Sequence, residues 1–353
     1  MGEEGGAVID FNVSPFVVIW ENTRACDLAC VHCRAAAQSR RSQYELTTEE
    51  GFRLIDEIAT MQPKVFVLTG GDPLKREDTY ALVRHARDKG LEPSLTPSAT
   101  PLLTEEAVTR MKEHGLGRMA VSLDASNAAL HDDFRRVPGS FDITLRAIRQ
   151  ASRENIPVQV NTTVTRRTIA DLPHMVELLT SLRIAMWSVF FAVPTGRAKQ
   201  SDLVTAFEVE ELFGFLFDTS KRVPFSIRTT EAMHYRRYVL QNGGAMPLGV
   251  QPNGPPRAPR GVNEAKGFVF VSHIGDVYPS GFLPLKAGNV KQQPLSEIYR
   301  TSPLFIDLRD SNNLHGKCGR CEFRDLCGGS RARAWSMTGD VFGSDPLCAY
   351  QPA

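Results

Sequence analysis

Apolar residues follow two different spacings over the first two hundred positions of the chain. Short β-branched and aromatic runs of strand length alternate with longer stretches in which apolar residues recur every three or four positions. The expected strands are 16–20, 64–69, 92–96, 118–123, 157–164 and 186–193, and the expected helices are 48–61, 78–89, 105–114, 143–155 and 169–182. Strands separated by helices in this way predict right-handed βα units around a parallel sheet. Periodicity alone fits both a doubly wound sheet and a partial barrel.

The regular alternation of strand and helix patterns ends in the second half of the chain. Helical patterns at 208–217 and 231–240 flank a short strand at 223–227. Residues 241–261 are too rich in Gly and Pro for a regular element, and we expect this loop to be mobile or locally disordered. An alternating pattern resumes at 267–278, where a turn at Ile274-Gly275-Asp276 predicts a β-hairpin.

Composition narrows the choice of partners and compartment. The 353 residues carry a formal charge of +1 with no run of Lys or Arg, so the sequence lacks the basic footprint of a dedicated DNA-binding protein. Its start has no secretory signal pattern, and no apolar stretch approaches the roughly 20 residues that span a bilayer. We therefore expect a cytoplasmic protein with no membrane partner. In that reducing compartment, seven cysteines grouped near the two ends indicate metal ligation rather than disulfides.

The first cysteine group follows the first expected strand directly. Cys26, Cys30 and Cys33 are separated by three and then two residues, so one short loop can bring three thiolates to three corners of a 4Fe–4S cube and leave the fourth iron open. The alternative is a zinc site completed by His32 or a distant ligand, although zinc sites usually carry their cysteines in CxxC pairs. We expect His32 to pack or to form hydrogen bonds rather than to bind metal.

This CX3CX2C loop resembles the signature of the radical S-adenosylmethionine (radical SAM) superfamily. The resemblance implies a partial (β/α)6 TIM-like barrel over residues 1–200. It also implies that the open iron chelates S-adenosylmethionine, which one-electron reduction cleaves to a 5′-deoxyadenosyl radical, with Cys26, Cys30 and Cys33 as the catalytic cluster ligands. A flavodoxin- or ferredoxin-type protein is the electron donor that such chemistry implies.

Other segments extend the resemblance and imply the S-adenosylmethionine contacts. The sequence Gly70-Gly71-Asp72-Pro73 is similar to the family's GGE motif, with an Asp that is one methylene shorter than the usual Glu. The triplet 122–124 resembles the family's SLD segment, and 193–197 resembles its adenine-contacting segment. Thr96-Pro97-Ser98 departs from the usual Asn-Gly at a ribose contact. The implied cofactor-binding residues are Gly70, Gly71, Asp72, Pro73, Ser122, Asp124, Arg135, Asn161 and Val193, with Arg136 as the alternative to Arg135 for pairing with the methionyl carboxylate.

The second cysteine group lies near the C-terminus and contains Cys318, Cys321, Cys327 and Cys348. From the spacing alone, these four thiolates suit a tetrahedral zinc ion or a fully ligated 4Fe–4S cluster. The segment resembles the twitch or SPASM-type extension of radical SAM enzymes, which implies an auxiliary cluster. Ser280 stands where two-cluster SPASM proteins carry a cysteine, so we predict one auxiliary 4Fe–4S cluster. The resemblance divides the rest of the chain into a helical linker (201–265) and a small C-terminal iron–sulfur domain of β-hairpin and short helices (266–353).

Three functions are consistent with these features. The closest likeness is to enzymes that trim tetrapyrrole side chains in heme d1 synthesis and in the alternative heme pathway. It implies hydrogen abstraction from a propionate and loss of its carboxyl group. The first alternative is a radical SAM maturase that modifies a ribosomal peptide, although no winged-helix peptide-binding domain precedes the first strand. The second is a non-catalytic zinc-binding or electron-carrier protein. Arg197, Arg228, Arg236 and Arg237 are candidates to bind propionates, or are solvated surface residues.

Overall fold

The computed structural model describes residues 9–244 and 261–353. Its ten strands form one sheet in the order β10-β9-β8-β1-β2-β3-β4-β5-β6-β7. The strands are β1 Val17–Thr23, β2 Val65–Gly70, β3 Pro93–Leu95, β4 Arg118–Ser122, β5 Val158–Val164, β6 Met186–Phe191, β7 Ser226–Thr230, β8 Phe268–Val271, β9 Asp276–Tyr278 and β10 Gly288–Asn289. The helices are α1 Thr48–Met61, α2 Thr79–Asp88, α3 Glu105–Glu113, α4 Ala128–Arg135, α5 Ser140–Arg153, α6 Leu172–Ser181, α7 Ala206–Ser220, α8 Tyr235–Gln241, α9 Leu295–Thr301, α10 Pro303–Arg309, α11 Gly316–Arg320 and α12 Arg331–Thr338.

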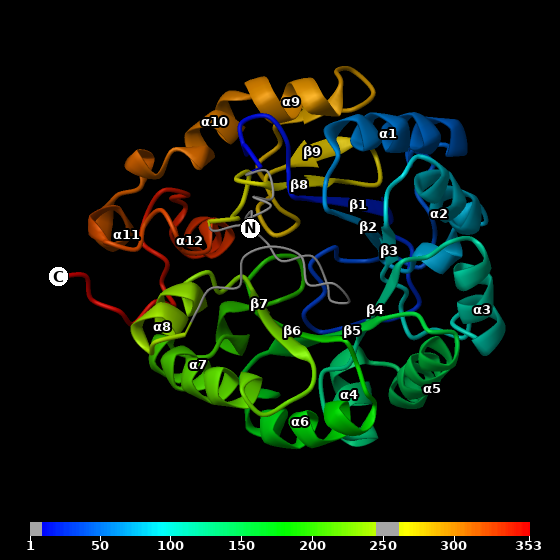
Figure 1. The fold of residues 1–353 in the computed structure, drawn as a ribbon, viewed down its shortest axis with the longest axis horizontal. Helices are drawn as coiled ribbons and strands as arrows, with labels where there is room; N and C mark the ends of the chain where they lie inside the picture. Colours follow the sequence, from blue (N-terminus) through cyan, green and yellow to red (C-terminus); the bar gives the residue numbers. More distant parts are fainter. Residues whose placement is uncertain (1–8, 245–260) are drawn as a thin grey trace, which may run out of the picture.

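The first seven strands pair in parallel and in chain order. They curve into a ring with α1 to α7 on its outer side (Figure 1). Helices on one side only distinguish this arrangement from a doubly wound sheet, which has helices on both faces. The predicted partial barrel is therefore confirmed.

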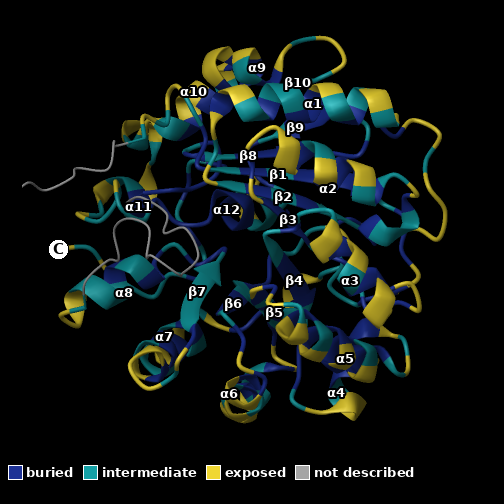
Figure 2. Ribbon diagram, turned by 45° about the vertical axis from the view of Figure 1, so that its right-hand side comes forward, coloured by how far each residue is buried: buried dark blue, intermediate teal, exposed yellow. Residues whose placement is uncertain are grey.

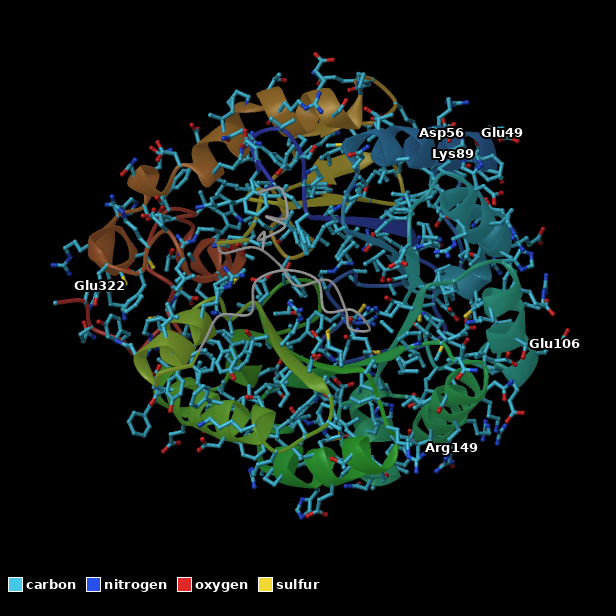
Figure 3. All side chains as sticks on the ribbon, in the orientation of Figure 1. Glu49, Asp56, Lys89, Glu106, Arg149 and Glu322 are labelled. Atoms are coloured by element: carbon cyan, nitrogen blue, oxygen red, sulfur yellow. The ribbon has the colours of Figure 1, made fainter. Side chains whose placement is uncertain are left out.

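The strands inside the ring are buried or half-buried, and the outer faces of the helices are exposed (Figure 2). Trp20 in β1 is fully buried and packs so closely on Gly51 of α1 that a Cβ there would lie 2.7 Å from the indole. Helix α1 begins with a capping box: Glu50 N–H donates to Thr47 Oγ1 (3.2 Å), and Thr47 N–H donates to Glu50 Oε2 (2.9 Å). The labelled charged residues Glu49, Asp56, Lys89, Glu106, Arg149 and Glu322 lie around the outer rim (Figure 3).

The sheet extends further than the sequence pattern predicted. β7, expected at 223–227, lies at Ser226–Thr230 and pairs with β6. The predicted hairpin β8–β9 is confirmed, and β8 also pairs in parallel with β1. The C-terminal segment therefore joins the barrel sheet directly, and the boundaries expected at 200 and 266 fall within one continuous sheet. Residues 245–260 of the expected loop 241–261 lie outside the described residues.

Two local features escaped the periodicity argument. β1 runs on to Thr23 because its polar end is held by polar partners: Arg34 pairs with Glu21 at 2.7 Å, and Thr23 Oγ1 donates to Glu45 Oε1 at 2.7 Å. Helix α4, which carries Arg135, was not predicted, although Asn127 caps it through its side chain. Among the described helices, none is both long and apolar enough to cross a membrane.

Candidate functional site

The ends of the parallel strands surround an open cavity of about 1200 Å³, counted out to its mouth. This is the end of a parallel barrel where ligand sites are found. Nine of the residues expected at the site line it: Cys26, Cys30, Cys33, Gly70, Gly71, Ser122, Arg135, Asn161 and Val193. Lining residues that were not predicted as contacts include Arg34, Ser98, His131, Thr163, Phe190 and Phe282. Asp72, Pro73 and Asp124 were predicted as contacts but are not among the lining residues.

The three cysteines of the first group lie on a loop that is closed at its base. Ala25 bridges to Gln38, and Cys26 N–H donates to Gln38 O at 2.8 Å. The far side of the loop is tied to the barrel, where Val31 N–H donates to Phe134 O at 3.1 Å. The loop therefore holds three unpaired thiols at the edge of the cavity.

Burial raises the pKa of the Cys26 thiol to about 11. It also raises the pKa of Cys30, although the neighbouring Arg135 opposes the shift, with Nη1 at 3.5 Å from the sulfur. Leu28 N–H donates to Cys26 Sγ at 3.4 Å, and Ala37 N–H donates to Cys33 Sγ at 3.5 Å. N–H groups aimed at sulfur suit thiolate ligands, and the positive charge of bound iron favours the deprotonated form that burial alone disfavours. The loop therefore fits an iron–sulfur cluster.

Gly70 and Gly71 press the end of β2 against the cysteine loop. A Cβ on Gly70 would lie 2.6 Å from Thr23 O, and one on Gly71 would lie 2.5 Å from Ala25 O. The approach is fixed by Gly71 N–H donating to Thr23 O at 2.8 Å. Neither contact leaves room for a side chain, so this pair of glycines sets the position of the loop that carries the thiols.

The carboxylate of Asp72 lies one layer behind the cavity. It accepts hydrogen bonds from Thr100 Oγ1 (2.7 Å), Leu74 N–H (3.1 Å) and Ser98 N–H (3.3 Å). Burial raises its pKa, and these bonds oppose the shift. Ser98, in the segment that departed from the family pattern, lines the cavity instead, and its hydroxyl donates to Gly71 O at 2.6 Å. Asp72 therefore orders the cavity wall that Ser98 presents.

Asp124 likewise lies behind the cavity wall and orders a residue that lines the cavity, Arg135. The buried carboxylate accepts from Arg135 Nε at 2.6 Å and from Thr163 N–H at 2.8 Å. The Arg135 guanidinium holds the pKa of Asp124 below its usual value against the effect of burial. Arg135 lines the cavity, whereas Arg136 is exposed and pairs with Asp133 at 2.9 Å. Of the two arginines considered, Arg135 is the one at the site.

His32 packs as expected. Its ring stacks on Phe134 with centroids 4.4 Å apart, and burial lowers its pKa to about 3. A neutral, stacked imidazole suits a packing role.

Three of the four arginines considered as propionate ligands are engaged elsewhere. Arg197 Nε donates to Cys30 O at 2.9 Å, which ties the cysteine loop to the end of β6. Arg236 donates to the carbonyl oxygens of Leu326 (3.0 Å) and Val262 (2.5 Å), and Arg237 pairs with Glu210 at 2.5 Å. These contacts cross-link parts of the fold. Arg228 lies in β7.

The second cysteine group converges on a separate, smaller cavity. Cys318, Cys321, Cys327 and Cys348 all line a space of about 340 Å³. Three N–H donors face the sulfurs: Arg331 Nη2 and Asp345 N to Cys318 Sγ (3.6 and 3.4 Å), and Gly329 N to Cys327 Sγ (3.3 Å). Burial raises the pKa of Cys327 to about 12 and that of Cys348 to about 11.

The arrangement of the thiols bears on the choice between zinc and a cluster. In the part of the chain that the structure describes, no three His, Cys, Asp or Glu side chains close on a single metal ion. In each site the thiols surround a space into which a cluster fits. Ser280 is not among the residues that line the smaller cavity, and its hydroxyl accepts from Phe282 N–H at 3.2 Å.

Comparison with known proteins agrees with this geometry. The profile of the radical SAM superfamily matches residues 20–179, and that of the SPASM iron–sulfur cluster-binding domain matches residues 264–322. An AdoMet-dependent heme synthase of Methanosarcina barkeri is 38% identical over 96% of this chain and 97% of its own length. A PqqA peptide cyclase of Rhodopseudomonas palustris is 24% identical over 100% of this chain and 91% of its own length. The Streptococcus suis SuiB structure with S-adenosylmethionine has the same fold, with a TM-score of 0.74 and 16% identity over 96% of this chain and 78% of that one.

Proposed function

The chain belongs to the radical SAM superfamily and carries its SPASM extension, and we propose that it converts propionate side chains of a tetrapyrrole by removing their carboxyl groups. The observation that carries this proposal is the 38% identity to an AdoMet-dependent heme synthase over nearly the whole of both chains. The peptide cyclase is more distant, at 24% identity.

Within this proposal, Cys26, Cys30 and Cys33 would hold the catalytic 4Fe–4S cluster, which would supply the electron for reductive cleavage of S-adenosylmethionine. Arg135, fixed by Asp124 at 2.6 Å, offers a guanidinium for the methionyl carboxylate. Ser122 and Asn161 lie side by side on β4 and β5 in the same cavity. Their polar groups suit the nucleoside portion.

The overall reaction balances at the substrate. Removal of one hydrogen atom from the propionate carbon next to the ring, followed by loss of carbon dioxide, leaves a vinyl group and one surplus electron. Cys318, Cys321, Cys327 and Cys348 would hold one auxiliary cluster, which supplies a place for that electron. We further propose a flavodoxin- or ferredoxin-type electron donor and a cytoplasmic location.

The test is anaerobic incubation of the reconstituted enzyme with S-adenosylmethionine, dithionite and iron coproporphyrin III, followed by mass spectrometry. We expect 5′-deoxyadenosine together with a porphyrin that has lost the mass of formic acid from each converted side chain. Formation of 5′-deoxyadenosine with no change in porphyrin mass would count against a tetrapyrrole substrate and in favour of a peptide.

A further inference from the structure

Two half-exposed aromatic rings face each other inside the main cavity. Phe190 is in β6, and Phe282 follows β9, yet their ring centroids lie 6.4 Å apart with the planes at 53°. β6 is second from one end of the ten-strand sheet and β9 is second from the other. The contact therefore brings opposite parts of the curved sheet together, and the cavity is complete only when the C-terminal segment is in place.

Phe282 is held firmly in this position. Its N–H donates to Ser280 Oγ at 3.2 Å, and Ser280 forms a bridge with Leu283. Arg34 crosses behind the turn: its Nη1 donates to Gly281 O at 3.1 Å, and its guanidinium lies 5.9 Å from the Phe282 ring. Because an aromatic ring fixed in advance loses little conformational entropy on binding, Phe282 is suited to hold a ligand.

The cavity has a polar part and an apolar part. The cysteine loop, Ser122, Arg135 and Asn161 supply the thiols and polar groups, and Phe190 and Phe282 supply apolar surface. The polar part suits S-adenosylmethionine, and the apolar part is left for a second reactant.

We propose that Phe190 and Phe282 together form the wall against which the flat face of the tetrapyrrole packs. This inference rests on the proposed function and assigns the part of the cavity that binds the macrocycle. A large conjugated ring gains most of its binding free energy from apolar contact, and aromatic side chains match its flat faces. The engagement of Arg197, Arg236 and Arg237 in other contacts agrees with binding through the ring face.

The experiment compares F190A and F282A with F207A. Phe207 in α7 is 69% exposed and lies outside the residues that line the cavity, so F207A removes the same ring without touching the wall. The anaerobically reconstituted holoenzymes are titrated with iron coproporphyrin III by absorbance. S-adenosylmethionine cleavage by dithionite is measured in parallel without porphyrin.

We expect F190A and F282A each to raise the porphyrin Kd by about tenfold or more, a larger factor than any change in S-adenosylmethionine cleavage without porphyrin. F207A should leave both values unchanged. F190L and F282L keep most of the apolar volume and are expected to give intermediate Kd values, which covers the case in which an alanine variant misfolds.

Two results would overturn the inference while the proposed function stands. The first is an unchanged porphyrin Kd in all four wall variants when the wild type binds and converts the porphyrin. The second is a parallel loss of porphyrin binding and porphyrin-free S-adenosylmethionine cleavage in the leucine variants, which indicates a purely structural role. A wild-type enzyme that neither binds nor converts the porphyrin would overturn the proposed function and this inference with it.

Discussion

The two cysteine sites differ in what surrounds the thiols. The first opens into a cavity of about 1200 Å³, and its loop is held by backbone contacts and by two arginines, Arg135 and Arg197. The second surrounds a smaller space of about 340 Å³ and lies against a buried ion pair, in which Arg333 donates to both oxygens of Asp345 at 2.9 and 2.8 Å. The larger space offers polar and aromatic surface beside its three thiols, whereas four of the residues around the smaller space are cysteines. The two groups of thiols therefore lie in different surroundings.

The largest expected effect separates the two sites. Replacing Cys26, Cys30 and Cys33 together with Ala removes every protein ligand of the first cluster, so 5′-deoxyadenosine formation should fall to background. Iron analysis and electron paramagnetic resonance should still show the auxiliary cluster. The matched variant, C327A, should lose the auxiliary signal and retain porphyrin-free S-adenosylmethionine cleavage. Retained cleavage in the triple variant would break the assignment of the catalytic site.

The second prediction tests the buried Arg333–Asp345 ion pair at the C-terminal cysteine site. D345N leaves Arg333 fully buried without its charged partner. Removing one member of a buried pair costs about 3–5 kcal/mol, so the denaturation midpoint should fall and the auxiliary cluster should be lost first. The control is E105Q, because Glu105 and Arg153 form a largely exposed pair at 3.5 Å and such pairs contribute little. Equal stability of D345N and E105Q would contradict the difference between the sites.

The third prediction concerns a buried pair of carboxylates beside the same ion pair. Glu231, which has a left-handed φ of 58°, bonds Ser330, and Glu264 Oε1 accepts from Ala332 N–H at 3.0 Å. The other oxygen of Glu264 has no donor partner, and burial together with the facing carboxylate of Glu264 raises the pKa of Glu231 well above 4.5. We predict that the two carboxylates share one proton, which would satisfy both groups.

The sign of the pH effect follows from that shift. Above about pH 4.5, the unfolded chain loses its Glu protons while the folded pair keeps one, so the free energy of unfolding falls as pH rises, by up to about 1.4 kcal/mol per pH unit for one proton. E231Q carries its own N–H donor and should flatten this slope in denaturation measured across neutral pH. Asp345, with a pKa held low by Arg333 despite burial, acts in the opposite sense at acidic pH. An identical slope in wild type and E231Q would rule out the shared proton.

The difference between the sites also explains what could be read from the sequence. Strand and helix periods are local, so the barrel and both cysteine groups could be predicted. Contacts that join distant segments have no local signal: β8 beside β1, and Phe282 facing Phe190, follow only from the closed fold. The motif residues Asp72 and Asp124 could be identified but not assigned to the layer behind the wall, because the spacing of a motif does not say which partner its carboxylate finds. Arg197, Arg236 and Arg237 could be named as propionate ligands or solvated residues, but a sequence cannot show that the first two bond backbone carbonyls and the third pairs with Glu210.

The smallest expected effect tests how finely the open site is ordered. Ser98 is the lining residue that joins Gly71 O, at 2.6 Å, to the region of Cys26, whose sulfur lies 3.5 Å from its hydroxyl. S98A removes one neutral hydrogen bond, worth about 1 kcal/mol, and should weaken S-adenosylmethionine binding by about fivefold. Isothermal titration against the control S152A, at an exposed position in α5, measures the change. The electron paramagnetic resonance signal of the auxiliary cluster should be unaffected in S98A, because Ser98 belongs to the first cysteine site. A change in that signal would mean that the two sites are not independent.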